Sequence, residues 1–239
     1  MSHARGAQVD VWLADLEPGK TVVESYASTL TTDERARAGR FHFPRDAAHW
    51  IVARGTLRAI LSNRLRIEPR DVRFVYGEHG KPELAEPFAG SGLRFNLSHS
   101  GGLALCAVVR HCRVGVDIER FRPVPDLEAI AERTFSPRER ETLRQLPPEL
   151  RDEGFFNCWT RKEAYIKAIG KGLAHPLDRF SVSLAPGAPA RLEAVDDDPW
   201  EAEAWTLEAF VPSAGYAAAL VVEGRADRIV RDTWPGDAR

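Results

Sequence analysis

The sequence is poor in features that mark several common classes of protein. Its 239 residues contain three cysteines, Cys106, Cys112 and Cys158, and no two of them have the CxxC spacing of metal-binding or redox motifs. No stretch approaches the roughly 18 apolar residues that a membrane-spanning helix needs, and the N-terminus lacks the apolar segment of a signal peptide. We therefore expect a soluble cytoplasmic protein with no membrane partner, whose cysteines are reduced and take part in packing.

Charge of one sign is not in excess. The 33 Lys and Arg residues oppose 35 Asp and Glu, a formal net charge of −2 at pH 7, so nothing global predicts nucleic-acid binding. Neither the GxxxxGK[ST] phosphate loop nor the GxGxxG dinucleotide motif is present, which argues against the common nucleotide-binding folds. What remains is a globular composition, 44% apolar and 28% charged, in a chain long enough for one large domain or two small ones.

Two similar series of predicted elements occupy the two halves of the chain. A capping-box pattern, Ser or Thr followed three residues later by Glu, predicts the start of a helix at residues 31–34 and again at 136–139. Each pattern precedes a longer helical segment, WIVARGTLRAIL from Trp50 and WTRKEAYIKAIG from Trp159. Aligned by these tryptophans, Arg58 corresponds to Lys167, and the position of Glu163 is held by Arg54. An acidic group in only one of two similar frameworks predicts a single active site.

The strands that follow also repeat. FVYGEHGKPEL from Phe74 and FSVSLAPGAPARL from Phe180 each predict a strand and a turn, and SGGLALCAVV and SAGYAAALVV each predict a glycine turn before a buried strand. We therefore predict an α+β protein of two similar α+β halves, residues 1–113 and 114–239, related by a pseudo-twofold axis. The ligand site is expected in the cleft between the halves, and the internal repeat favours a monomer.

Three carboxylates stand out in the second half. Asp117 and Glu119 of VGVDIER lie two residues apart in a predicted strand, which places them on one face about 7 Å apart. With Glu163 they form an all-oxygen ligand set that suits Mg²⁺ or Mn²⁺ better than zinc. The alternative is that Asp117 and Glu119 are exposed charges near arginines at the end of the strand, and that Glu163 pairs with Lys167 four residues on.

Groups that could hold an anion are found in both halves. FNLSHSGG, residues 95–102, places His99 at a glycine-rich turn whose backbone N–H groups could bind phosphate. Lys167 shares a helix face with Glu163, and Lys162 lies about 100° around the same helix. The first half adds basic residues whose geometry suits phosphate: Arg35, Arg37, Arg40, Arg54 and Lys81. Taken singly, each is explained as well by a solvated helix face or a surface turn.

In combination and in this order, GKPEL, FNLSHSGG, GVDIER and WTRKEAYIKAIGKGL resemble the motifs of the 4′-phosphopantetheinyl transferase superfamily. The resemblance is to the long, surfactin-synthetase-activating type, extends over most of residues 30–222, and implies a pseudodimeric α+β fold. It implies that the phosphopantetheine arm of coenzyme A is transferred to a serine hydroxyl of an apo acyl or peptidyl carrier protein, leaving adenosine 3′,5′-bisphosphate. The alternatives are a non-catalytic module that binds coenzyme A or a carrier protein, and a phosphodiesterase that removes the arm.

The resemblance also implies roles for individual residues. Asp117, Glu119 and Glu163 would bind Mg²⁺, with Asp117, Glu163 and Lys167 as the catalytic set. Glu163, directly or through a metal-bound water, would accept the serine proton. The second half would also dock the carrier protein, and the first would contact the nucleotide and the 3′-phosphate. The implied contacts to coenzyme A are Arg37, Arg40, Arg54, Lys81, Pro82, Ser98, His99, Lys162 and Lys167. One departure is Glu34, which stands where the family can have a lysine near the 3′-phosphate.

Overall fold

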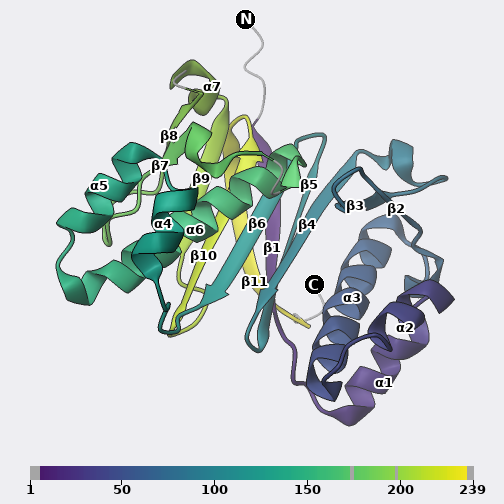
Figure 1. Cartoon of the computed structure of the whole chain (residues 1–239). Coiled ribbons are helices and arrows are strands. Elements are labelled where there is room, and N and C mark those ends of the chain that lie inside the picture. The colour runs from purple at the N-terminus through teal and green to yellow at the C-terminus, as the bar shows by residue number, and fades with distance from the viewer. Residues whose placement is uncertain (1–5, 173–174, 197–198, 236–239) are drawn as a thin grey trace, which may run out of the picture.

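The structure, a computed structural model, describes residues 6–172, 175–196 and 199–235 (Figure 1). Its main strands are β1 (Ala7–Asp15), β4 (Leu93–Ser100), β5 (Leu103–Arg110), β6 (Val114–Arg120), β9 (Trp205–Phe210), β10 (Tyr216–Glu223) and β11 (Ala226–Trp234). They form one sheet in the order β11-β1-β5-β4 and a second in the order β6-β10-β9. Two short antiparallel hairpins are added by β2 (Phe74–Tyr76) with β3 (Pro82–Leu84) and by β7 (Phe180–Val182) with β8 (Leu192–Val195).

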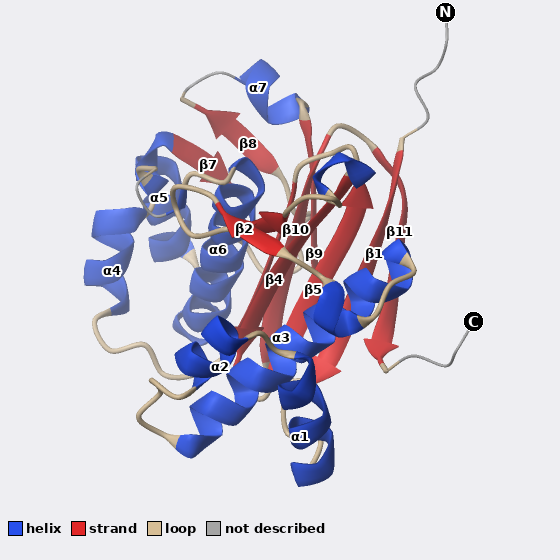
Figure 2. Ribbon diagram, turned by 90° about the vertical axis from the view of Figure 1, so that its right-hand side faces the viewer, coloured by secondary structure: helices blue, strands red, loops and turns tan. Residues whose placement is uncertain are grey.

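Helices flank the strands on both sides (Figures 1 and 2). The first half contributes α1 (Lys20–Thr29), α2 (Thr32–Ala38) and α3 (Pro44–Leu65), and the second contributes α4 (Leu127–Thr134), α5 (Pro137–Gln145), α6 (Pro148–Ile169) and α7 (Pro199–Glu203). Both predicted capping boxes are confirmed, at the starts of α2 and α5. Among the described residues, no helix is both long enough and apolar enough to cross a membrane.

The two central strands each separate two hydrophobic cores. On β10, Ala217, Ala219 and Val221 pack toward α6, whereas the intervening Ala218, Leu220 and Val222 pack between the sheets. On β5, Cys106 and Val108 face α3, and their neighbours Leu105, Ala107 and Val109 face the shared core between the sheets. The alternation follows from the two-residue period of a strand buried on both faces. All three cysteines are free, as predicted, with Cys106 and Cys158 buried and Cys112 half-buried.

The order of elements repeats once along the chain. Each half runs from a strand through a capped short helix and a long helix to a hairpin and two further strands. In the first half β5 lies between β1 and β4, and in the second β10 lies between β6 and β9. The prediction of an α+β fold with two similar halves is therefore confirmed.

One buried ion pair marks equivalent positions in the two halves. Arg58 of α3 contacts Glu34, the capping-box glutamate of α2, with 2.7 Å between Nη2 and Oε2. Lys162 of α6 contacts Glu139, the capping-box glutamate of α5, with 2.8 Å between Nζ and Oε2. Since α3 and α6 both have 22 residues and both begin at a proline, the ion pairs and the helix ends give the same alignment.

This alignment differs from the predicted one by five residues. Arg58 corresponds to Lys162 rather than to Lys167, and Ala59, rather than Arg54, holds the position of Glu163. The predicted register was wrong because it relied on Trp50 and Trp159, which lie on different turns of the two helices. The asymmetry itself persists, since the first-half counterpart of Glu163 is an alanine.

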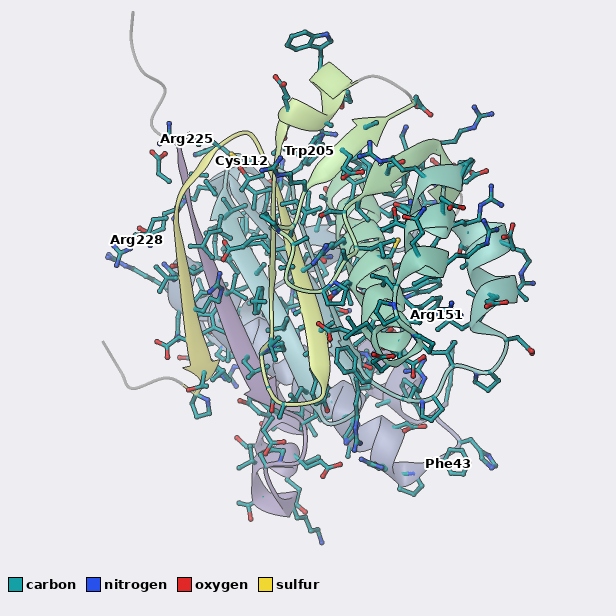
Figure 3. The ribbon with its side chains drawn as sticks, turned by 90° about the vertical axis from the view of Figure 1, so that its left-hand side faces the viewer. Phe43, Cys112, Arg151, Trp205, Arg225 and Arg228 are labelled. Atoms are coloured by element: carbon teal, nitrogen blue, oxygen red, sulfur yellow. The ribbon has the colours of Figure 1, made fainter. Side chains whose placement is uncertain are left out.

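The last strand does not belong to the half in which the sequence places it. The predicted second half, residues 114–239, includes β11, but β11 pairs in parallel with β1 of the first sheet. The start of β11 also contacts β9: the Thr206 hydroxyl accepts from Ala226 N–H (3.2 Å) and donates to Gly224 O (2.6 Å) in the turn before β11. Figure 3 shows β11 at the edge of the molecule, with Arg225 just before its start and Arg228 on its outer side.

Candidate active site

Side chains of β4 bridge the seam between the two halves. The strand orders do not place β4 beside β6 in either sheet, so this seam is closed by side chains rather than by a backbone ladder. Every second residue of β4 faces β6, as strand geometry requires. Asn96 Oδ1 accepts a hydrogen bond from the Val116 N–H (2.8 Å). The Ser98 hydroxyl donates to Asp117 Oδ1 (2.7 Å), and the Ser100 hydroxyl donates to Glu119 Oε2 (2.7 Å). The FNLSHSGG and VGVDIER motifs thus meet at one line of contacts.

Asp117 is the most buried of the three predicted acids, with 3% of its surface exposed. Its Oδ1 accepts from Ser98 Oγ and, at 2.6 Å, from the ammonium of Lys167 on α6. Lys167 also donates to Ser98 Oγ at 2.9 Å, which makes a closed triangle of polar groups. Asp117 Oδ2 is buried with no hydrogen-bond partner. An unpaired buried carboxylate oxygen is costly, so this atom is free to take a ligand.

Glu163 carries a second such oxygen. Its Oε1 is buried without a hydrogen-bond partner. Burial raises the pKa of Glu163, Lys167 opposes that rise, and the negative charges of Asp117 and Glu119 add to it. The pKa of Glu163 thus depends on both of the other predicted carboxylates and on Lys167.

The donor set fits a hard divalent cation. All candidate ligand atoms are carboxylate oxygens, and two of them, Asp117 Oδ2 and Glu163 Oε1, are buried and unpaired. Over residues 6–172, 175–196 and 199–235, however, no three His, Cys, Asp or Glu side chains already converge as the ligands of one ion. Glu119, with 21% of its side chain exposed, and Glu163 would have to adjust their side chains around a bound metal.

The β2–β3 hairpin forms one wall of a pocket of about 490 Å³ beside these acids, with lining residues that include Lys81, Pro82, Asn96, Glu163 and Lys167. The Lys81 ammonium donates to Val114 O at 3.0 Å and to the backbone carbonyl of Lys167 at 2.5 Å. Burial, the dominant effect, lowers the pKa of Lys81 to about 8. Lys81 thus fastens the hairpin to the second half, and its predicted contact with coenzyme A stays a prediction.

Lys162 lies outside this site, and its prediction as a coenzyme A contact is wrong. Its side chain is 1% exposed, and its ammonium contacts Glu139 and donates to Leu177 O (2.7 Å) and Phe180 O (2.6 Å). All three partners belong to the core of the second half. The helical rotation of about 100° between Lys162 and Glu163 turns the lysine into the protein interior.

A larger pocket, of about 970 Å³, lies in the first half between α2, α3 and β2. Arg37, Arg40 and Tyr76 line it, together with Phe41 and Phe74. Two of the predicted phosphate-binding arginines, Arg37 and Arg40, are therefore brought to one concave surface with aromatic side chains around it.

Arg54 and Glu34 support this pocket from within. Arg54 is 6% exposed, contacts Glu34 Oε1 at 3.2 Å and donates to the Tyr76 hydroxyl at 2.5 Å. Glu34 is buried and lies between Arg54 and Arg58, while its carboxylate also accepts from Thr31 N–H. The glutamate that departs from the family pattern is thus neutralised by two guanidinium groups. Arg54 positions Tyr76, and a direct contact with coenzyme A would require it to give up these partners.

His99 lies on the opposite side of β4 from Ser98 and is exposed. Partial burial, followed by the positive charge of Lys167 and the charge of His49, lowers its pKa. Two residues with roles at the seam, Asn96 and Ser100, were not singled out from the sequence. The two-residue spacing of Asn96, Ser98 and Ser100 in FNLSHSGG was the signal that could have revealed them.

Sequence profiles of known families match both halves of the chain. Residues 14–111 match the 4′-phosphopantetheinyl transferase N-terminal family, and residues 113–221 match the 4′-phosphopantetheinyl transferase superfamily. The chain belongs to the 4′-phosphopantetheinyl transferase superfamily, and the match to both halves indicates its long type.

Two 4′-phosphopantetheinyl transferases of known sequence agree with this assignment. The chain is 45% identical over 217 residues to the 4′-phosphopantetheinyl transferase HetI of Nostoc sp., covering 91% of this chain and 88% of HetI. It is 34% identical over 174 residues to the 4′-phosphopantetheinyl transferase Sfp of Bacillus subtilis, covering 72% and 75% of the two chains. A similar solved structure is the holo-[acyl-carrier-protein] synthase of Thermotoga maritima, with 26% identity, a TM-score of 0.37 and coverage of 47% of this chain and 63% of that one.

Proposed function

We propose that this phosphopantetheinyl transferase moves the arm of coenzyme A to a serine hydroxyl of an apo acyl or peptidyl carrier protein, with Mg²⁺ or Mn²⁺ held by Asp117, Glu119 and Glu163. Adenosine 3′,5′-bisphosphate is the second product. The observation that supports this most directly is the pair of buried, unpaired oxygens, Asp117 Oδ2 and Glu163 Oε1, beside the Lys167 ammonium. They combine ligands for a cation with a positive group for a phosphate in one place.

The metal, when bound, would neutralise the pyrophosphate of coenzyme A and stabilise the charge that develops on the leaving phosphate. Lys167 binds a phosphate oxygen through its ammonium while Ser98 and Asp117 keep that ammonium in place. Lys81 and Pro82 line the pocket beside Glu163 and Lys167. Lys81 would contact the phosphates, and so would His99, whose pKa responds to burial and to the charge of Lys167.

In the transfer step, the serine oxygen of the carrier forms a bond to the phosphorus that carries the pantetheine arm. The bond from that phosphorus to the 5′-phosphate oxygen of the nucleotide breaks, and the electron pair leaves with adenosine 3′,5′-bisphosphate. Glu163, directly or through a metal-bound water, accepts the serine proton.

In this proposal the nucleotide end of coenzyme A lies in the first-half pocket. Arg37 and Arg40 supply positive charge for the 3′-phosphate, and Tyr76, held by Arg54, offers an aromatic surface to the adenosine. Glu34 does not repel the phosphate because Arg54 and Arg58 neutralise it.

A mass-spectrometric assay run in both directions tests the proposal. Incubation with coenzyme A, Mg²⁺ and an apo carrier domain should add the mass of one phosphopantetheine to the carrier. A phosphodiesterase would instead release the arm from holo carrier, and a binding module would change neither mass. Absence of loading with several different carriers would refute transfer.

A further inference from the structure

Ser100, the last residue of β4, makes a pair of bonds that the proposed chemistry does not explain by itself. Its hydroxyl donates to Glu119 Oε2 at 2.7 Å and accepts from the Arg120 backbone N–H at 3.1 Å. We propose that Ser100 is a positioning residue, which fixes the Glu119 carboxylate in the orientation needed to bind the divalent cation. This inference rests on the proposed function, since it gives Glu119 its purpose.

The direction of the Ser100 bond follows from its two partners. A serine hydroxyl has one proton and two lone pairs. The Arg120 N–H donates to one lone pair, and the hydroxyl proton points at Glu119 Oε2 because an ionised carboxylate can only accept. The Arg120 N–H thus orients the Ser100 hydroxyl, and that hydroxyl orients the Glu119 carboxylate.

Glu119 needs such a restraint more than Asp117 does. Asp117 is 3% exposed and is held by both Ser98 and Lys167, whereas the Glu119 side chain is 21% exposed and has one more rotatable bond. The other group at Glu119 Oε2 is Nη1 of Arg122, at 3.4 Å. Arg122 is 64% exposed, so without Ser100 the carboxylate would follow the guanidinium toward solvent.

Ser100 also differs from Ser98, its neighbour on the same face of β4. Ser98 contacts both Asp117 and Lys167, so its loss would disturb a metal ligand and a phosphate-binding group together. Ser100 contacts one carboxylate and one backbone group of β6. Replacing Ser100 therefore tests the orientation of Glu119 without disturbing Asp117 or Lys167.

Mn²⁺ binding, followed by electron paramagnetic resonance with and without coenzyme A, is the direct test on the full chain. Ser100→Ala should weaken Mn²⁺ binding roughly 10- to 100-fold, the usual effect of removing a group that orients a metal ligand. The Mg²⁺ concentration for half-maximal transfer should rise by a similar factor, and saturating Mg²⁺ should restore most of the rate. Ser100→Thr keeps a hydroxyl and should restore binding, and Ser100→Cys, a weak donor of similar size, should fall between them.

Thr206→Val is the matched control. The Thr206 hydroxyl of β9 also donates to one group and accepts from another, but both partners are backbone groups, Gly224 O before β11 and Ala226 N–H at its start. This variant removes a similar pair of hydroxyl bonds away from the β4–β6 seam and should leave Mn²⁺ binding unchanged.

Equal Mn²⁺ affinity of the wild type and Ser100→Ala would overturn the inference, as would an equal loss in Ser100→Ala and Thr206→Val. If Ser100→Ala does not fold, the Ser100→Cys and Ser100→Thr pair decides the question, and equal affinity of these two would overturn it. A wild type that loads no carrier would count against the proposed function. A wild type that loads carrier while Ser100→Ala keeps its Mg²⁺ requirement would count against the role of Ser100 alone.

Discussion

Replacing Lys162 with methionine tests whether this residue serves the core or the ligand. The Lys162 and Glu139 side chains are each 1% exposed, with 2.8 Å between Nζ and Oε2. Breaking a buried ion pair by removing one partner costs about 3–5 kcal/mol, because the other charge stays buried. The lower end applies here, since Glu139 keeps the backbone N–H groups of Ser136 and Val182, both at 2.7 Å.

A loss of about 3 kcal/mol corresponds to a fall of roughly 6–12 °C in Tm for a domain of this size. Circular dichroism would measure Tm, and transfer assays at a temperature where both proteins are folded would give KM for coenzyme A. We expect an unchanged KM, because the methionine would occupy a position that does not reach the site. Adding Glu139→Gln to the same chain should recover part of the stability by removing the unpaired charge. A wild-type Tm together with a tenfold higher KM would show that Lys162 binds the ligand, and would refute the structural account.

Glu163→Gln should lower kcat by at least about 10²-fold with Tm nearly unchanged, because the residue supplies the proton acceptor; a near-normal rate would contradict that role. Arg37→Ala should raise KM roughly tenfold for coenzyme A but little for dephospho-coenzyme A, which lacks the 3′-phosphate; equal losses would contradict the assignment. The folded-state pKa of Lys81, about 8, lies below its ordinary 10.5. The unfolded chain therefore binds more protons between these values, and the unfolding free energy should rise from pH 8 to 10.5 in wild type relative to Lys81→Met; a constant difference would contradict the shift. Light scattering should give a mass near 26.6 kDa, and a dimer would contradict the expected monomer.

Local signals made the repeat predictable from the sequence. The capping boxes at Thr31 and Ser136 involve residues three apart, so each fixes the start of its helix without help from the rest of the chain. The alternation in VGVDIER likewise placed Asp117 and Glu119 on one strand, and the ordered motifs indicated the family. The capping boxes and the strand alternation depend only on neighbours within one turn or one strand.

The register of the long helices could not be read in the same way. Both α3 and α6 are buried over much of their circumference, so their apolar pattern matches itself in several registers. The pairs that fix the alignment, Arg58 with Glu34 and Lys162 with Glu139, join residues 23 or 24 positions apart, and only the fold brings them together. The same limit explains why Lys162 was taken for a ligand contact.

β11 was missed for a different reason. Its side chains do not alternate regularly between buried and exposed, because one of its edges and much of its surface face solvent. Its partner β1 lies at the other end of the chain, and strand pairing over such a distance is not encoded in either segment alone.

The position of β11 has a consequence for stoichiometry. A duplicated framework offers two equivalent seams, one beside β6 and one beside β1. At the seam beside β6, polar side chains of β4 contact the predicted metal ligands Asp117 and Glu119. Beside β1, the corresponding space is occupied by β11, which pairs with β1 through backbone hydrogen bonds. We therefore expect each molecule to bind one coenzyme A and to load one carrier at a time, with a ratio of one to one in calorimetric titration. We therefore expect the two similar halves to take different roles in a single active site, the first contacting the nucleotide and the second holding the metal.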